Sequence, residues 1–228
     1  MTVFNRAVEH SVAVSIDSQR ESFFCSKRFK RSFDVTFAVF ALASAAVVML
    51  VIAICLRLCS KDPVWFAHER VGLDGKTFKC LKFRTMYSDS DAILAQHLVE
   101  NPEARVEYNT YLKLRDDPRV IGFIGKFLRK TSLDELPQFI NVLRGEMSIV
   151  GPRPVTEPEI KLYGSAAPKV LSVRPGITGL WQVSGRNRFT FDERVTIDQE
   201  YVRNQSFGLD LSIICQTVVV LLLRRDGY

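Results

Sequence analysis

Two adjacent carboxylates, Asp134 and Glu135, stand in the stretch RKTSLDELPQFINVLRGEMSIVGPRP, which runs from Arg129 to Pro154. In phosphoryl chemistry one carboxylate can attack phosphorus, while a neighbouring carboxylate holds a Mg²⁺ ion that also binds the phosphate oxygens of a substrate. Adjacent acids are common at the start of a helix, so the pair alone is a weak motif. Its meaning depends on the side chains that accompany it.

The element that must position this pair is the helix predicted by the apolar periodicity that follows it. Ser132 and Glu135 have the spacing of a capping box. Pro137 argues against a helix that begins at Ser132, because the proline would then delete an internal hydrogen bond. We therefore expect the helix to begin at Asp134, its N-cap, with the proline in the first turn. At the positive end of the helix dipole, both carboxylates should stay ionised at neutral pH, and we expect the Asp134 side chain to be exposed.

Phosphoryl transfer is catalysed mainly by positioning and by cations that neutralise the phosphate oxygens. Arg129 precedes the dyad, while Arg153 in GPRP and Arg174 in RPGITG each stand before a proline, near glycines. Arg186 and Asn187 in SGRN add a planar donor fork and an amide. A single arginine is most often a solvated surface charge, but four arginines framed by glycine and proline favour a phosphate site.

A long apolar segment indicates where this chemistry takes place. From Val35 to Leu56 the chain has no charge and no proline, and as a helix it would extend roughly 33 Å, about one bilayer core. Two other interpretations are a signal peptide cleaved near Ala43 and Ala45, and a buried helix of a soluble protein. The segment is longer than either of these usually is.

Basic residues flank this segment on both sides, with Lys27, Arg28, Lys30 and Arg31 before it and Arg57, Lys61 and Arg70 after it. Because positive charge favours the cytoplasmic side, a helix that enters and leaves the membrane on the same face satisfies both flanks. Nothing in the segment is an obvious helix breaker, although the small residues from Ala43 to Ala46 would permit a bend.

The rest of the chain predicts a helix-rich α+β fold. We expect a flexible N-terminal tail at 1–26, a re-entrant membrane helix at 27–60 and a small cytoplasmic catalytic domain at 61–228. Asp74-Gly75 predicts a β-hairpin between Val64 and Met86, and two surface helices should fill residues 88–115, broken at Asn101-Pro102. Residues 121–130 predict an amphipathic helix that lies on the membrane or faces the core, and the apolar residues 211–223 should pack on the domain or lie on the membrane.

Composition excludes some classes of function. Lys and Arg number 31 against 25 Asp and Glu, a formal charge of +6, which is compatible with nucleic acid, an anionic membrane or phosphorylated substrates. The basic residues form no recognised nucleic-acid module, so we expect no nucleic-acid partner. The 5 cysteines form no C-x-x-C pair and lie near no histidine cluster, so neither a disulfide framework nor a zinc site is indicated.

Taken in order, KRFKRSFDV, GKTFKCLKFRTM, GKFLRKTSLDELPQFINVLRGEMSIVGPRP and VRPGITGLWQVSGRN resemble the bacterial sugar transferase family of monotopic phosphoglycosyl transferases. The resemblance covers about residues 27 to 225. It implies transfer of a sugar 1-phosphate from a UDP-sugar to undecaprenyl phosphate, with Mg²⁺ as cofactor and release of UMP, at the cytoplasmic face of the bacterial inner membrane. In that family a Ser-Pro pair commonly breaks the re-entrant helix, whereas the region around Ala46-Val47 has no proline.

The resemblance also implies roles for individual residues. Asp134 becomes the nucleophile that forms a covalent phosphosugar intermediate, and Glu135 becomes the Mg²⁺ ligand. Contacts to substrate phosphates are implied for Arg129, Arg153, Arg174 and Lys82 of LKFRTM, and nucleotide or sugar contacts for Arg186 and Asn187 of SGRN.

Two rival functions remain at this stage. A membrane-bound phosphatase or nucleotidyl transferase could use the same carboxylate and Mg²⁺, and a membrane-tethered scaffold could bind anionic lipid without catalysis. The resemblance favours galactose over glucose as the sugar, but no residue gives a physical reason for that choice. Whether the chain forms a homo-oligomer is open.

Overall fold

The computed structural model describes residues 27–111, 114, 116–185 and 189–222, so the predicted tail and Arg186 and Asn187 lie outside the described residues. The helices are α2 (Lys27–Cys59), α3 (Ser90–Glu100), α4 (Pro102–Tyr111), α5 (Gly122–Thr131), α6 (Gln138–Arg144), α7 (Glu157–Leu162), α8 (Ala167–Val170), α9 (Leu180–Ser184), α10 (Phe191–Asn204) and α11 (Phe207–Leu222). The strands are β1 (Trp65–Val71), β2 (Thr77–Phe83), β3 (Ser148–Val150) and β4 (Gly176–Thr178). The 3₁₀ turns are η2 (Leu73–Gly75), η3 (Leu133–Glu135) and η4 (Gly164–Ala166). The expected helix-rich α+β fold is confirmed.

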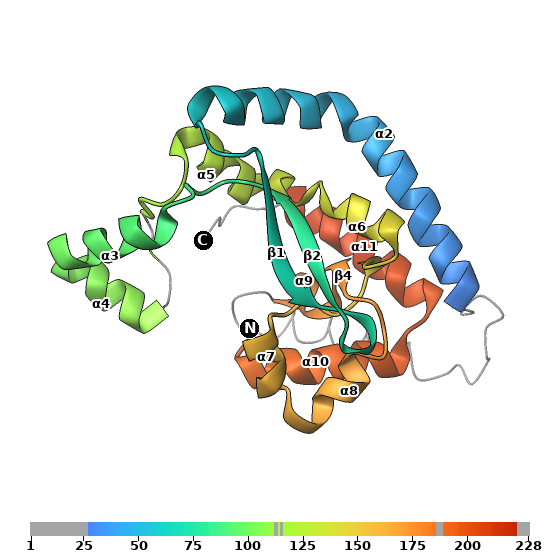
Figure 1. Ribbon diagram of the computed structural model, residues 1–228. Helices are drawn as coiled ribbons and strands as arrows, with labels where there is room; N and C mark the ends of the chain where they lie inside the picture. Colours follow the sequence, from blue (N-terminus) through green and yellow to red (C-terminus); the bar gives the residue numbers. More distant parts are fainter. Residues whose placement is uncertain (1–26, 112–113, 115, 186–188, 223–228) are drawn as a thin grey trace.

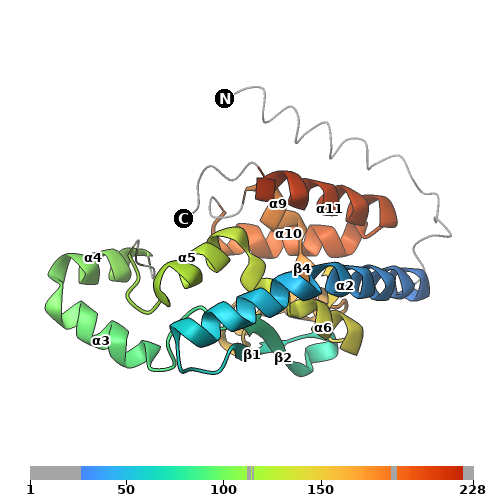
Figure 2. The same ribbon diagram turned by 90° about the horizontal axis from the view of Figure 1, so that it is seen from above.

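Helix α2 is one continuous helix that arcs over the rest of the molecule (Figure 1). In the view from above it runs between α11 and the β1–β2 hairpin (Figure 2). Its first part contacts the domain through Asp34, whose Oδ1 accepts a hydrogen bond from the backbone N–H of Ile149 at 3.1 Å. Its last part packs Ile52 and Leu56 against Phe83 and Leu128. Both ends of the apolar helix therefore contact the same domain.

This helix is apolar and mostly unburied, which argues against the interpretation of the segment as a buried helix of a soluble protein. In its most apolar stretch only 11% of the residues are buried, so it is not the core helix of a soluble domain. Large side chains such as Phe40, Val47 and Leu58 are exposed. By length and composition it is the one helix among the described residues that could cross a membrane. Exposed apolar surface of this extent is stable only when lipid or another apolar phase covers it.

The predicted hairpin is confirmed. Strands β1 and β2 pair antiparallel from Trp65 opposite Phe83 to Val71 opposite Thr77. At the turn Asp74 has φ 55° and Gly75 has φ 76°, and a left-handed backbone of this kind favours aspartate and glycine.

The two helices expected in residues 88–115 are also present, as α3 and α4, and they stand away from the rest of the domain (Figure 1).

Helix α5 confirms that residues 121–130 form an amphipathic helix with one face on the core. Leu128 is completely buried in the cluster beneath α2, so one face packs on the core. On another face Phe123 is 83% exposed, and its ring stacks on that of Phe127 at 6.3 Å. With Lys126 beside these aromatic rings, this outer face has the composition of a helix that lies at a membrane surface.

The short parallel pair β3–β4 brings two distant motifs together. Ser148 pairs with Gly176 and Val150 pairs with Thr178. A Cβ on Gly176 would lie 2.1 Å from the backbone N of Gly151, so glycine is required where GPRP meets RPGITG.

Helix α11 packs Ile213 into the core beside these strands while Val218 and Val219 are exposed, as the prediction for residues 211–223 allowed.

Candidate active site

The dyad lies in η3, between α5 and α6. Ser132, with φ 58°, ends α5 in the left-handed conformation and reverses the chain into η3. Helix α6 begins at Gln138, so the expectation that Asp134 caps this helix is wrong. The chain makes a 3₁₀ turn first, and Pro137 follows as the N-cap of α6 with a helical backbone, where its missing N–H costs no internal hydrogen bond.

Asp134 is buried, with 9% of its surface exposed, whereas the sequence predicted an exposed side chain. Burial raises the pKa of the Asp134 carboxyl to about 6, since a charged carboxylate is poorly solvated there. The nearby charges of Lys82 and Arg129 act in the opposite direction and limit the rise in pKa, while Glu135 adds to it. Asp134 is thus mostly ionised at pH 7, as expected. Its carboxylate is, however, desolvated by burial, whereas we had expected the helix dipole to stabilise its charge.

Glu135 forms an ion pair with Lys82 of strand β2. The Lys82 Nζ lies 2.6 Å from Glu135 Oε1, and both side chains are half-buried. The hairpin and the dyad are therefore connected by a charge-assisted hydrogen bond, which is stronger than a neutral one. This pair also places a cation directly beside the carboxylate that the sequence assigned to Mg²⁺.

A cavity of about 480 Å³ opens over the dyad, and it brings together five of the predicted site residues: Lys82, Arg129, Asp134, Glu135 and Arg153. Arg70 lies close by, in a small adjoining pocket that shares Lys82, Glu135 and Arg153. Burial and the charge of Arg153 lower the pKa of the Arg70 guanidinium, which indicates crowding of positive charge. A carboxylate surrounded by cations in a concave site is suited to a phosphorylated, anionic ligand.

Arg174 does not join this group. Its Nε donates a hydrogen bond of 2.7 Å to the carbonyl oxygen of Gly145, which ends α6. Arg31 donates to the carbonyls of Val142 and Leu143 in the same last turn, at 2.6 and 3.0 Å. Both guanidinium groups therefore satisfy carbonyls at the end of α6 opposite to the dyad, and Arg174 is not among the residues that line the cavity.

The cavity also contains residues that sequence reasoning did not single out. Phe66 of β1 lies opposite Lys82 in the hairpin, and the Arg84 guanidinium lies 5.4 Å from the centre of the Phe66 ring. Beyond them the lining continues through Tyr87, Ser88 and neighbouring residues. Arg84 directly follows β2 and stands two residues after Lys82, a spacing that puts side chains on one face of an extended chain, and this is the signal that could have found Arg84.

The described residues contain no group of three or more His, Cys, Asp or Glu side chains that could hold a metal ion. The cavity nevertheless fits the way Mg²⁺ is commonly bound, by one or two carboxylates together with the phosphate oxygens of a substrate. The Lys82 ammonium beside Glu135 indicates that this position accepts a cation. An ion held here would depend on the substrate for its remaining ligands.

Comparisons with known proteins identify the family of this chain. The family model described as bacterial sugar transferase matches residues 25–224. The exopolysaccharide production protein ExoY of Sinorhizobium fredii is 48% identical over 199 residues, which is 87% of this chain and 88% of that protein. The undecaprenyl-phosphate galactose phosphotransferase of Salmonella typhimurium is 44% identical over 205 residues, 89% of this chain but 42% of its own length. An undecaprenyl-phosphate glucose phosphotransferase of Komagataeibacter xylinus is 36% identical over 211 residues, 87% of this chain and 37% of that protein.

The family model spans nearly the whole chain, and two of these three relatives are much longer proteins of which this chain matches only part. The apolar helix, the dyad and the cavity above it all fall within the matched residues. The chain belongs to the bacterial sugar transferase family.

Proposed function

We propose that this protein transfers a sugar 1-phosphate from a UDP-sugar to undecaprenyl phosphate and releases UMP, the first membrane step of exopolysaccharide synthesis. The observation that carries the proposal is the cavity in which the desolvated carboxylate of Asp134 lies among Lys82, Arg129 and Arg153, on a domain that packs against an apolar helix.

In the proposed mechanism an Asp134 oxygen attacks the phosphorus that carries the sugar. The bond from this phosphorus to the bridging oxygen breaks, and UMP leaves with the electron pair. A phosphate oxygen of undecaprenyl phosphate then attacks the same phosphorus, and the bond to Asp134 breaks, which regenerates the carboxylate. Desolvation favours this chemistry, because a poorly solvated carboxylate is a better nucleophile than one surrounded by water.

The cations have the complementary role. Charge on the phosphate oxygens would be neutralised by Lys82, Arg129 and Arg153, which line the cavity around the carboxylate. Glu135 is the residue that would hold Mg²⁺, and the ion when bound supplies further neutralisation of phosphate charge. The Lys82 ammonium, which pairs with Glu135 in the structure, would then be available to a substrate phosphate.

This proposal explains why the chain carries a membrane helix. A polyprenyl phosphate stays in the bilayer and a UDP-sugar stays in water, so the nucleophile has to lie at the interface. An anchor that enters and leaves on one face is supported by α2, whose two ends contact the same domain. We place the domain at the cytoplasmic face of the inner membrane, where UDP-sugars are available, with α5 resting on the headgroups.

Galactose is the proposed sugar, on the strength of the relatives alone. The relatives named for galactose transfer include a UDP-galactose-lipid carrier transferase of Erwinia amylovora at 44% identity, compared with 36% for the glucose phosphotransferase.

The test measures UMP release by membranes that contain the protein, with a panel of UDP-sugars, with and without undecaprenyl phosphate and Mg²⁺. We expect sustained UMP release only when lipid and Mg²⁺ are both present, with UDP-galactose as the best donor. Sustained phosphate or nucleotide release without lipid would instead identify a phosphatase or nucleotidyl transferase. A folded, membrane-bound protein that turns over no donor would be a scaffold.

A further inference from the structure

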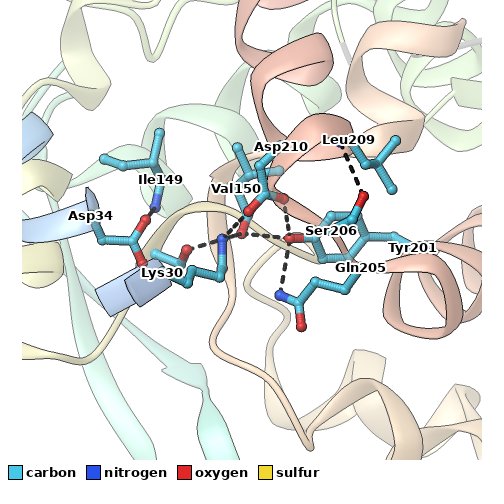
Figure 3. A network of polar contacts seen from close by, with 10 residues as sticks. Lys30, Asp34, Ile149, Val150, Tyr201, Gln205, Ser206, Leu209 and Asp210 are labelled. Atoms are coloured by element: carbon cyan, nitrogen blue, oxygen red, sulfur yellow. Dashed lines mark hydrogen bonds and ion pairs between the residues drawn. The ribbon is translucent and has the colours of Figure 1, made fainter. Parts of the chain in front are cut away.

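A buried polar cluster joins the base of the membrane helix to the C-terminal helices (Figure 3). The Lys30 Nζ of α2 lies 2.6 Å from Asp210 Oδ2 of α11 and 3.1 Å from the carbonyl oxygen of Val150. The Tyr201 hydroxyl of α10 lies 2.8 Å from Asp210 Oδ1 and 3.0 Å from the same carbonyl. Four segments of the chain therefore meet at one carboxylate and one backbone carbonyl.

The polar groups of this cluster are buried and hydrogen-bonded to one another, so the cluster is not an incidental surface contact. Asp210 is 2% exposed and Tyr201 is fully buried. Burial raises the pKa of the Asp210 carboxyl, while the Lys30 charge and the hydrogen bonds from Lys30 and Tyr201 act to lower it. Removing one partner from such a buried network leaves a charge or a polar atom without compensation, which is strongly destabilising.

The carbonyl of Val150 is the point at which the cluster reaches the active site. It accepts from Lys30, from Tyr201 and also from the Ser148 hydroxyl at 3.0 Å. Val150 ends β3, and the next residues, Gly151 and Pro152, lead to Arg153 in the cavity. Because the backbone of Gly151 is packed directly on Gly176, the turn has little freedom once Val150 is fixed.

The neighbouring residue of α2 makes a second connection. Arg31 donates to the carbonyls of Val142 and Leu143 in the last turn of α6, the helix that follows the dyad. Two consecutive residues of the membrane helix thus bind the strand that leads to Arg153 and the last turn of the helix that follows the dyad. Neither residue lines the described cavity, so neither would touch the substrate there.

We propose that Lys30, Asp210 and Tyr201 form a positioning cluster, which fixes the Arg153 turn to the base of the membrane helix and so sets where Arg153 meets the substrate phosphate. The inference rests on the proposed function, in which Arg153 binds phosphate. Displacement of a positioned group by an ångström can cost on the order of a hundredfold in rate, so a contact outside the cavity can control the reaction.

The first test compares Tyr201→Phe with Thr217→Val in the full-length protein in lipid nanodiscs. Tyr201→Phe keeps the ring and removes one hydroxyl from the cluster. Thr217→Val removes a hydroxyl that lies 2.7 Å from Thr178 Oγ1, about two turns further along α11. We expect both variants to fold, with the larger loss in Tm in Tyr201→Phe, and kcat/KM for the UDP-sugar to fall about tenfold in Tyr201→Phe only. Equal losses of kcat/KM in both would mean that the cluster is merely structural.

The second test asks whether the cluster acts through Arg153, by a double-mutant cycle on the affinity for UMP. UMP binding requires no turnover, so every variant can be measured. We expect Tyr201→Phe and Arg153→Lys each to weaken UMP binding severalfold, and the double variant to be little weaker than Arg153→Lys alone. Independent, multiplying effects, or an Arg153→Lys variant with unchanged affinity, would overturn the inference.

The two proposals fail in different ways. A wild-type protein that releases no UMP from any UDP-sugar contradicts the proposed function. A wild-type protein that does release UMP, with independent effects of Tyr201 and Arg153 on UMP affinity, contradicts the positioning cluster alone.

Discussion

The Lys82 ammonium lies 2.6 Å from a carboxylate oxygen of Glu135, so the β-hairpin supplies the cation and η3 supplies the anion of one ion pair in the lining of the cavity. Neither residue is close to the other in sequence, and each is half-buried. A carboxylate that already binds a cation in the free protein is preorganised for a metal, and its lysine is held next to the place where a phosphate would lie.

Glu135→Gln should therefore change the response to Mg²⁺ as well as the rate. We expect UMP release to fall by at least about tenfold and the Mg²⁺ concentration for half-maximal rate to rise, because an amide is a weaker ligand for a hard cation. The matched control is Glu146→Gln, since Glu146 lies beyond the other end of α6 and bonds to the Asn141 side chain. A Mg²⁺ titration of Glu135→Gln that matches the wild type would remove Glu135 from the metal.

Asp134→Asn should abolish transfer and stabilise the fold at the same time. The folded-state pKa of about 6 lies above the ordinary value for aspartate, so ionisation of Asp134 costs stability as the pH rises from about 4 to about 6. Without Mg²⁺, the neutral variant should gain up to roughly 3 kcal/mol over the wild type at pH 7.5, and the gain should disappear near pH 4. Thermal unfolding with a chelator present checks this, and a variant less stable than the wild type at pH 7.5 would contradict it.

We expect a second effect of pH on folding stability at Asp198, away from the dyad. Its side chain is buried on α10, where Tyr163 donates a hydrogen bond of 3.1 Å to Oδ2, and burial raises its pKa to about 7. The stability that the protonated form contributes is fully present below about pH 4 and is lost as the pH rises to about 7. We expect the stability difference between Asp198→Asn and wild type to shift in favour of the variant across this window. A difference that stays constant from pH 4.5 to 7.5 would show that Asp198 does not titrate there.

Much of the fold follows from local sequence rules. The Asp74-Gly75 turn requires a left-handed backbone, and the two residues adopt it. The uncharged segment from Val35 to Leu56 lies within one unbroken helix, and Asn101-Pro102 separates α3 from α4. In each case the outcome depends on φ and ψ preferences or on a continuous apolar run, and these are properties of neighbouring residues.

The site depends on long-range packing, and there the sequence was a weaker guide. Asp134 is buried where strand β2 packs against η3, a contact that no local pattern predicts. Arg174 resembles Arg153 in its setting before a proline, yet it binds Gly145 at the far end of α6. Lys30 and Asp210 are 180 residues apart in sequence and form an ion pair. The residue types predicted the class of chemistry, while the tertiary contacts decide which of them take part.

The aromatic face of α5 should matter only when the lipid substrate is in a bilayer. Replacing Phe123 and Phe127 by serine removes exposed rings that would insert among the headgroups. We expect the rate with undecaprenyl phosphate in vesicles to fall severalfold, and the rate with a short, water-soluble polyprenyl phosphate to change by less than about twofold. The control replaces Val99 and Val106, which are also exposed but lie on α3 and α4. Equal effects of the two double variants in vesicles would contradict a special role for α5.

The central claim, that Asp134 carries the sugar phosphate, is tested most directly by single-turnover chemistry without the lipid. The protein is mixed with excess UDP-galactose and Mg²⁺, quenched in acid, and examined by intact-mass and peptide mass spectrometry. The account predicts one UMP released per active site and a hexose phosphate adduct on the peptide that contains Asp134, absent from Asp134→Asn and removed when undecaprenyl phosphate is added before the quench. UMP release that requires the lipid from the first turnover, with no adduct at any time, would contradict it.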